Sequence, residues 1–364
     1  MILSRYLARR FAATFALVLT GFFAVLYLIE LVEQIRRFAG HDIGLGGAAR
    51  LAALKAPETV YRILPMVTIL AAIALFVALA RSSELVAIRA AGRSALRMLV
   101  SPLLTALAIG AVAVAVLNPV VAGLSKRYES LADRYRSGEE RVVSVSSEGL
   151  WLRQGGEQGQ TVIHAARASA EGTTLTDVTF ITFGPLGPVE RLDAAQAELT
   201  PGAWVLSDAK RWRFVAGANP EADAVLHPSY RLATDLTAER IRDSLGDPSA
   251  IAIWDLPDFI RALEQAGFSA RKHLVWLQME LALPLLLVTM VLVGAGFTMR
   301  HARSGRTGIS VLLAILSGFA IFLLRNFAQV LGENGQIPVA LAAWTPPVAA
   351  ALLSLSLILH LEDG

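Results

Sequence analysis

Six long stretches of this 364-residue chain carry no charged side chain, and each is long enough to form a helix that crosses a bilayer. They cover residues 11–29, 63–80, 98–125, 281–299, 307–324 and 336–359. Such a set exceeds what the core of a soluble protein can hide, since 55% of the chain is A, V, I, L, M, F, W or Y. We therefore predict an α-helical membrane protein with six transmembrane helices, three before and three after a polar middle region.

The first charge-free stretch shares one feature with a secretory signal peptide. Arg5, Arg9 and Arg10 precede it, as basic residues precede the apolar part of such a signal. Its apolar run is too long for that part, however, and Glu30 and Glu33 follow where a cleavage site requires small residues. We expect this stretch to remain in place as the first span.

The distribution of basic residues predicts the orientation, because short cytoplasmic loops carry an excess of Lys and Arg. With the N-terminus in the cytoplasm, ten basic residues fall on the inner side and six on the outer side. The inner residues are Arg5, Arg9, Arg10, Arg81, Arg89, Arg93, Arg97, Arg300, Arg303 and Arg306. The outer residues are Arg36, Arg37, Arg50, Lys55, Arg62 and Arg325. We predict that both termini are cytoplasmic and that the polar middle region lies on the opposite side.

The polar middle region, residues 126–250, has the pattern of an inserted all-β domain. Short β-like runs alternate with turn signals such as Gly155-Gly156 and Pro201-Gly202. The run at 173–183 shows no one-sided alternation, which predicts a strand that is covered on both faces or lines an apolar groove. This many short strands indicates a sandwich, a jelly roll or a half-open barrel, and the pattern does not choose among the three.

The chain is thus expected to consist of three parts. Residues 1–125 form the first three spans with a short cytoplasmic helix at 82–92, and residues 126–250 form the β domain. Residues 251–364 form a connecting helix, which Gly267 ends, and the last three spans.

Several kinds of chemistry lack the residues that they need. Without cysteine, the chain has no disulfide, no thiolate nucleophile and no Cys-ligated metal. None of its four lysines lies in a Gly-x-x-x-x-Gly-Lys-Ser/Thr loop, and its histidines lack the spacing of metal or hydrolase sites. We expect no catalytic site, no metal, no cofactor bound by this chain and no nucleic-acid partner. Energy for an uphill step would come from ATP that a partner subunit uses.

The cytoplasmic segment 82–92 predicts a short helix. Ser82 or Ser83 can cap it, Glu84 lies in its first turn, and Gly92 suits its end. Two functions fit equally well: a helix that lies on lipid headgroups, and a docking helix that inserts into a cytoplasmic partner and passes on its motion. For docking, the candidate residues are Ser83, Glu84, Leu85, Ile88, Arg89 and Gly92.

The outer end of the first span carries a dense group of charges. Glu33 and Arg37 are spaced i, i+4 in the order that favours an ion pair within a helix. The adjacent pair Arg36 and Arg37 lies on the predicted non-cytoplasmic side, where an excess of basic residues is not expected. A function could explain it, because Arg binds phosphate and carboxylate in bidentate fashion. The segment is either a helix end anchored at the headgroups or an anion site, and we favour the anion site.

Two ionisable residues, Glu280 and Arg325, lie at the edges of predicted spans. Ionisable groups at membrane depth are costly and face an interior or a cavity by default. We expect Glu280 to be an interfacial anchor, and we count Arg325 and the neighbouring Asn326 as intramembrane polar residues without an assigned role.

These segments together resemble the lipopolysaccharide export permeases of the LptF/LptG type, with the LptG branch the nearer. The resemblance extends over the whole chain, and the loop motif at 83–92 combined with Gly-Leu-Trp at 149–151 is its most specific part. The segments that carry it are 31–37 with Gly40, 83–92, 118–136, 148–153, 325–332 and 337–338.

The resemblance implies a heterodimer with a sibling six-span permease subunit on a cytoplasmic ATPase dimer, each permease carrying a periplasmic β-jelly-roll. It also implies a single-span jelly-roll partner, a periplasmic bridge protein and a place in the bacterial inner membrane. Lipopolysaccharide would enter beside the first and fifth spans and be extracted by the work of the ATPase.

Three positions carry over residue by residue. The basic residues that meet the anionic headgroup in the family map onto Arg36 and Arg37, and the family's coupling-helix glutamate maps onto Glu84. Relatives often have an acid near position 325, where this chain has Arg325, so the resemblance leaves the role of Arg325 open.

Two other classes of function remain open from the residues alone. A membrane-anchored sensor would use the β domain to bind a ligand and would need no ATPase. A membrane-embedded enzyme that modifies lipids would need a clustered acid, base or metal set, which the sequence does not offer.

Overall fold

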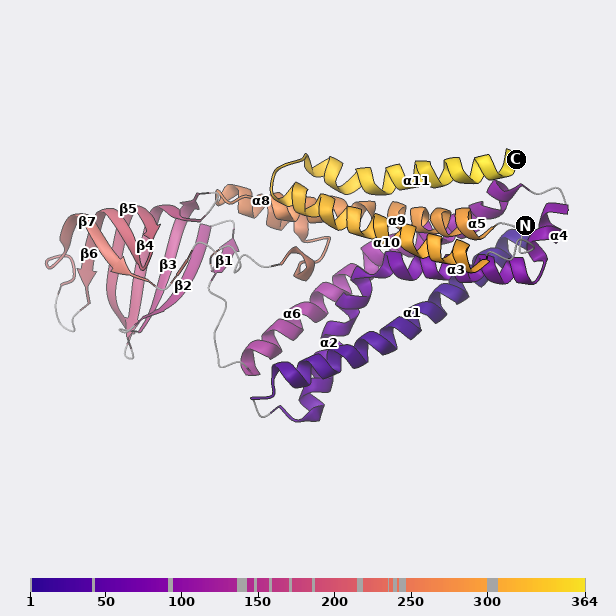
Figure 1. Ribbon diagram of the computed structural model, residues 1–364. Coiled ribbons are helices and arrows are strands. Elements are labelled where there is room, and N and C mark those ends of the chain that lie inside the picture. The colour runs from indigo at the N-terminus through magenta and orange to yellow at the C-terminus, as the bar shows by residue number, and fades with distance from the viewer. Residues whose placement is uncertain are drawn as a thin grey trace. The chain divides into compact units, whose positions relative to one another are not determined.

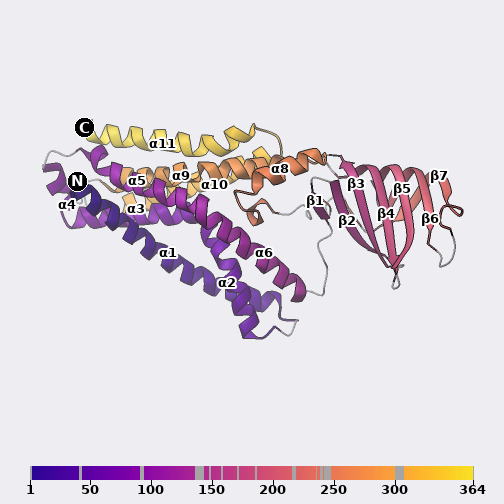
Figure 2. The same ribbon diagram turned by 180° about the vertical axis from the view of Figure 1, so that it is seen from behind.

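The structure is a computed structural model that describes residues 2–40, 43–90, 94–135, 143–146, 149–156, 159–169, 172–184, 187–214, 219–234, 236–237, 241, 247–299 and 307–363. The chain divides into two compact units. The helical unit holds residues up to 137, residues 249–254 and the helices from residue 274 onward. The β unit holds residues 138–248 and 255–273. Figures 1 and 2 show the elements of each unit from two sides.

Six helices in the described residues are long and apolar enough to cross a membrane, which confirms the prediction of six spans. They are α1 (Ile2–Arg37), α3 (Leu64–Arg81), the continuous run of α5 (Ala95–Val112), η1 (Ala113–Leu117) and α6 (Asn118–Tyr135), α9 (Arg271–Thr298), α10 (Thr307–Glu333) and α11 (Val339–Asp363). The division between the units falls near residue 137 rather than residue 125, because α6 continues as a helix to Tyr135.

Two further helices in the helical unit are not spans. α2 (Leu45–Arg62) lies between the first two spans, packs against α1 and α6, and carries several charges that lower its hydropathy. α4 (Glu84–Ala90) has only seven residues and follows α3 after a turn in which Ser83 adopts a positive φ of 58°. Figures 1 and 2 both place the two chain termini and α4 at one end of the helical unit, and the turn between α1 and α2 at the other.

α1 is long enough to project beyond the membrane at both of its ends. Its 36 residues extend over about 54 Å at 1.5 Å per residue, whereas the hydrocarbon core of a bilayer is about 30 Å thick. The charge-free stretch 11–29 fits that core, and Arg10 and Glu30 mark its limits.

Close packing of the spans depends on small residues at helix crossings. A Cβ atom at Gly110 of α5 would lie 2.5 Å from the Cα atom of Pro284 in α9, so only glycine permits this approach. Without a hydrophobic driving force between helices in lipid, such close backbone contact is what holds spans together.

The β unit contains one antiparallel sheet of seven strands in the order β1 to β7. The strands are β1 (Val143–Ser146), β2 (Gly149–Gly156), β3 (Gly159–Ala168), β4 (Thr174–Gly184), β5 (Gly187–Thr200), β6 (Ala203–Arg213) and β7 (Val225–Ala233). The inserted all-β domain is therefore confirmed. Its strands pair in sequence order, so the described sheet is an up-and-down meander and lacks the crossover connections of a jelly roll.

One face of the sheet forms the core of the β unit. A row of buried side chains crosses four strands through the paired residues Leu152, Ile163, Phe180 and Leu192, none of them more than 1% exposed. The ring of Trp204 packs edge-on against Phe180 at a centroid distance of 6.2 Å. The apolar residues of these strands thus line one common interior.

The first of the two expectations for the run at 173–183, that both of its faces are covered, was wrong. Leu175, Val178 and Phe180 of β4 are buried while Thr176 and Asp177 are exposed, so only one face is covered. The alternation shifts phase because Asp177 takes a positive φ of 52° and drops out of the pairing with β3 and β5. The register of β4 with both neighbours is the same on either side of Asp177, so a local interruption of the pairing at this residue, rather than coverage of both faces, accompanies the break in the period of two.

α8 (Leu256–Gln265) is the predicted connecting helix, and it belongs to the β unit. Its buried side chains are Leu256, Ile260 and Leu263. The backbone N–H of Ala168 in β3 donates to the carbonyl of Ala266 at 2.7 Å. Gly267 ends the helix as predicted, with a φ of +89° and no space for a Cβ, which would lie 2.0 Å from the Ala168 oxygen. The contact fixes α8 against the sheet.

Candidate functional site

The short helix α4 presents one face to the rest of the chain and one face to solvent. Leu85 and Ile88 are only 5% and 8% exposed, because they pack into the helical unit. Val86 is 53% exposed, and Ala87 and Ala90 are exposed beside it. Of the candidate docking residues, Leu85 and Ile88 are therefore interior, whereas Gly92 and the side chain of Arg89 lie outside the described residues.

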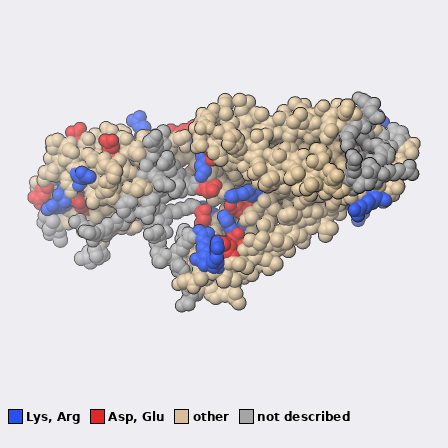
Figure 3. All heavy atoms as spheres, viewed as in Figure 1, with Lys and Arg blue, Asp and Glu red and all other residues tan. Residues whose placement is uncertain are grey.

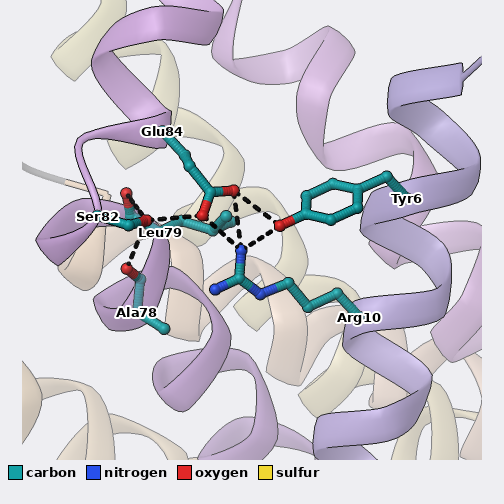
Figure 4. A network of polar contacts seen from close by, with 6 residues as sticks. All are labelled: Tyr6, Arg10, Ala78, Leu79, Ser82 and Glu84. Atoms are coloured by element: carbon teal, nitrogen blue, oxygen red, sulfur yellow. Dashed lines mark hydrogen bonds and ion pairs between the residues drawn. The ribbon is translucent and has the colours of Figure 1, made fainter.

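Glu84, the first residue of α4, is held by three side chains of the same chain (Figure 4). Arg10 of α1 donates from Nη1 to Oε1 at 2.7 Å and to Oε2 at 2.8 Å. The Tyr6 hydroxyl donates to Oε2 at 2.9 Å, and the Ser82 hydroxyl donates to Oε1 at 2.8 Å. Both carboxylate oxygens are thus engaged, and α4 is fastened to the N-terminal end of the first span. We call these four residues the α4 clamp.

The electrostatics of the α4 clamp favour the charged form of its carboxyl group. Hydrogen bonding by the Arg10 guanidinium, with smaller contributions from Ser82 and Tyr6, lowers the pKa of the Glu84 carboxyl below its usual value. The carboxylate is therefore ionised at neutral pH and available as a permanent partner for Arg10.

The C-terminal end of α1, which is the end predicted to lie on the outer side, is joined to α6 through Tyr128. The Tyr128 hydroxyl donates to Oε1 of the buried Gln34 at 3.3 Å and accepts a hydrogen bond from Arg37 Nη1 at 3.1 Å. Arg36 points away from this contact, with 78% of its side chain exposed, and pairs with Glu33 at 2.9 Å. The ion pair of Glu33 thus forms with Arg36, three residues away, rather than with Arg37, because Tyr128 draws Arg37 toward α6.

A second charged group lies beside this end, between α2 and α6. Glu58 is 8% exposed and accepts hydrogen bonds from Lys55 at 2.8 Å, Arg62 at 3.0 Å and Ser125 at 2.8 Å. Figure 3 shows basic and acidic atoms gathered on the helical unit at the ends of α2 and α6, and a broad surface without charge beyond them. The charges therefore mark one edge of an apolar band.

Inside the helical unit, a buried polar cluster joins three helices. Glu280 of α9 is 2% exposed and accepts hydrogen bonds from the Tyr61 hydroxyl and, at 3.2 Å, from Nδ2 of Asn118. The Asn118 side-chain oxygen accepts from the backbone N–H of Ile253 at 2.9 Å. The expectation that Glu280 is an interfacial anchor was wrong, because neighbouring helices enclose it.

Arg325 of α10 is 9% exposed and interacts electrostatically with Glu280 and Tyr61. This attraction to the buried carboxyl group supports a structural role for Arg325, which the sequence left without one. Asn326 is half-buried beside it.

The described residues offer no group of three or more His, Asp or Glu side chains that could hold a metal ion. What they provide is a set of polar contacts at the two ends of apolar helices: a clamp on α4 at one end and exposed arginines at the other. Such an arrangement can bind an amphiphile at its polar part and transmit motion along a span.

Sequence reasoning selected Glu84 and missed its partners Arg10 and Tyr6. Two signals could have found them. Tyr6 and Arg10 are spaced i, i+4 near the N-terminal end of the first span, and the predicted topology places both on the same side of the membrane as Glu84. It also missed Tyr61 and Asn118 as partners of Glu280, since 219 and 162 positions separate these residues in the sequence.

Comparison with known proteins adds an independent observation. The family model described as "Lipopolysaccharide export system permease LptF/LptG" matches residues 5–360. The lipopolysaccharide export system permease protein LptG of Escherichia coli K12 is 23% identical over 357 residues, 97% of this chain and 94% of the relative. The protein of the same name from Haemophilus influenzae Rd is 21% identical over 340 residues, 92% of this chain and 91% of the relative.

Proposed function

The chain belongs to the LptF/LptG family of lipopolysaccharide export permeases, nearer to LptG. From this membership we propose that it extracts lipopolysaccharide from the inner membrane and that a separate ATPase drives the extraction. As a permease component of an export system, it is a transporter subunit rather than an enzyme, and it is a multi-pass inner-membrane protein. In the proposed complex, a cytoplasmic ATPase dimer drives this chain and a sibling six-span permease subunit.

The low burial of α1 and α10 is the observation that carries this proposal. Only 6% of the most apolar window of α1 and 17% of that of α10 are buried, against 72% in α9 and 61% in α3. Both helices pack against α3. Apolar side chains on each remain exposed, such as Leu17 of α1 at 74% and Phe327 of α10 at 62%.

These open faces support a cavity for the lipid. Placed opposite a sibling permease, the first and fifth spans enclose a space lined by apolar side chains, which suits the acyl chains of lipopolysaccharide. Arg36 and Arg37 at the outer end of α1 then meet the anionic headgroup through charge-assisted hydrogen bonds.

The β unit continues the path of the lipid on the periplasmic side. Its apolar interior around Phe180 and Trp204 suits acyl chains. The Trp204 indole N–H is buried without a hydrogen-bond partner among the described residues, a costly state that a polar group of an incoming lipid relieves. A single-span jelly-roll partner and a periplasmic bridge protein then receive the lipid.

On the cytoplasmic side, α4 contacts the ATPase, and no cofactor binds to this chain itself. The position of α4 at the same end as both termini supports a cytoplasmic location for all three. Since Leu85 and Ile88 are interior, the contact surface is the outward side of α4 around Val86, Ala87 and Ala90.

Replacing Val86 with Asp tests this contact. Burial of an unpaired charge in an apolar interface is costly, so we expect the amount of ATPase that co-purifies with the permease complex to fall by about an order of magnitude. Val225→Asp is the matched control, because Val225 of β7 is exposed to a similar degree, 50%, and lies in the β unit. Membrane insertion should be normal in both variants. Undiminished co-purification with Val86→Asp would reject α4 as the ATPase contact.

A further inference from the structure

A short segment of the helical unit, residues 249–254, interrupts the β unit in the sequence. The β unit holds residues 138–248 and 255–273, and the residues between these ranges belong to the helical unit. Two hydrogen bonds join this segment to the third span. The backbone N–H of Ile253 donates to Oδ1 of Asn118 at 2.9 Å, and Nε1 of Trp254 donates to the carbonyl of Ala115 at 3.1 Å. We call residues 249–254 the strap.

The carbonyl that Trp254 binds lacks its ordinary partner. In a regular α-helix the Ala115 carbonyl would accept a hydrogen bond from the backbone N–H four residues later, but Pro119 has no N–H and its ring clashes with that carbonyl. The third span passes this point as a π-helix, η1, over Ala113–Leu117. In a helix apolar enough to cross a membrane, a freed carbonyl is costly unless a neighbouring group satisfies it. The indole N–H of Trp254 therefore takes the place of the N–H that Pro119 lacks.

The π-helix also decides which face of the third span meets α9. Gly110 lies against Pro284 of α9, and Asn118 donates to Glu280 of the same helix at 3.2 Å. In a regular α-helix, the eight positions from Gly110 to Asn118 would place the two residues about 80° apart around the axis. The wider turn of η1 takes up one extra residue, which corresponds to about 100° and brings both to within about 20° of one face. The contacts of the third span with α9 thus depend on η1.

The part of the third span beyond η1 carries contacts of the proposed headgroup site. The Tyr128 hydroxyl of α6 accepts a hydrogen bond from Arg37 at 3.1 Å and donates to Gln34 at 3.3 Å. Ser125 of α6 donates to Glu58 at 2.8 Å. A change in the angle between α5 and α6 would displace these contacts together, because they lie on one helix.

We propose that η1 is a hinge of the third span, that the strap holds this hinge at one angle, and that Trp254 is a positioning residue for α6. Through α6, Trp254 fixes the contact of Tyr128 with Arg37 and hence the place of this arginine. The consequence for Arg37 rests on the proposed function, whereas the hinge does not.

Pulsed electron paramagnetic resonance on the purified full chain measures the angle at the hinge. The chain contains no cysteine, so Leu104→Cys in α5 and Lys126→Cys in α6 attach two spin labels without background labelling. Both positions are exposed, and they lie on either side of η1. At 1.5 Å per residue they are about 33 Å apart along the helix, a separation that changes when the helix bends.

Three substitutions are combined with the two labels. Trp254→Phe removes the indole N–H and keeps an aromatic ring, and little packing is lost because Trp254 is 66% exposed. Pro119→Ala restores the backbone N–H at that position. Trp344→Phe is the matched control, because Nε1 of Trp344 donates to Gln278 at 2.9 Å elsewhere in the helical unit.

We expect one narrow distance distribution in the native chain and in Trp344→Phe. Trp254→Phe should raise the population of a second distance about fivefold, the effect of losing one hydrogen bond of typical strength. When Pro119→Ala is present, Trp254→Phe should add no further change, because residue 119 then supplies the donor. In membranes that contain lipopolysaccharide, photocrosslinking of the headgroup to Trp254→Phe should fall in proportion to the population that leaves the native angle.

Three results would overturn the proposal. A native distance distribution in Trp254→Phe would show that the strap does not hold the hinge. An equal change with proline and with alanine at position 119 would show that the indole ring, rather than its N–H, holds the strap. A changed distribution with native crosslinking would refute the positioning of Arg37. Failure of the proposed function is distinguishable, because the distances come from the chain alone, whereas that failure appears as a native chain that does not crosslink to lipopolysaccharide.

Discussion

Replacing Glu280 with leucine is expected to destabilise the helical unit by about 3 kcal/mol or more, since removal of one member of a buried charged cluster leaves the other uncompensated. Glu280 is 2% exposed and accepts hydrogen bonds from Tyr61 and Asn118. Leucine would leave both donors unpaired and Arg325, at 9% exposed, without its opposite charge. The midpoint of thermal unfolding of the purified chain in detergent measures the loss.

Two further variants separate charge from packing at this position. Glu280→Gln keeps an acceptor oxygen for Tyr61 and Asn118, so its melting temperature should lie between those of the native chain and Glu280→Leu. Combining Glu280→Leu with Arg325→Leu removes both charges and should regain part of the stability. If Glu280→Leu melts at the native temperature, the buried cluster does not hold α9 against α2 and α6.

Removing both side chains at the outer end of the first span, with Arg36→Ala and Arg37→Ala, is expected to weaken photocrosslinking to the lipopolysaccharide headgroup at least about tenfold. Each guanidinium offers a paired set of N–H donors that match a phosphate, and Arg36 is 78% exposed at its side chain. The readout is the crosslinked fraction in membranes that contain lipopolysaccharide, at equal expression of native and variant chains.

The controls isolate the charge of this arginine pair. Arg50→Ala removes an exposed arginine from α2, near the same end of α1, and should leave crosslinking unchanged. Tyr128→Phe breaks the hydrogen bond to Arg37 while keeping both arginines, which shows how much of the effect comes from positioning. Crosslinking that persists at the native level in the double alanine variant would reject an anion site at Arg36 and Arg37.

The spans were predictable because they depend on composition within short windows, and all six appear as apolar helices. α2 was not predicted, since Arg50, Lys55 and Arg62 were considered only as basic residues of a short outer segment. In the structure Glu58 accepts hydrogen bonds from Lys55, Arg62 and Ser125 of α6, so the charges are paired and the helix can pack. The pairs of Glu58 with Lys55 and Arg62 are spaced i, i+3 and i, i+4, a local signal of a helix, whereas the contact with Ser125 joins distant segments and has no local signal.

Within the β unit, the sequence predicted strands but not their arrangement. The missing alternation in β4 reflects two successive exposed residues, Thr176 and Asp177, and β5 and β6 show the same pattern at the paired positions. Asp177 and Asp208 adopt a positive φ there, which Asp tolerates better than most residues, yet nothing in the local sequence marks these positions. The order of the strands depends on pairing across turns, which composition does not specify.

The same limit applies to the candidate site. Glu84 was identified from its place at the start of the short helix and from the resemblance, and its role toward a partner stays a prediction. Within the chain, Arg10 and Tyr6 donate hydrogen bonds to it from 74 and 78 positions away in the sequence. No local pattern reports contacts between residues so far apart.

The dependence of this chain on a partner for energy is tested most directly by comparing it alone with the reconstituted complex. The purified chain and the complex with the sibling permease and the ATPase are placed in liposomes that contain lipopolysaccharide, and ATP hydrolysis and lipopolysaccharide release are measured together. We expect hydrolysis and ATP-dependent release only from the complex. Nucleotide turnover or covalent change of the lipid by the chain alone would refute its role as a permease driven by a separate ATPase.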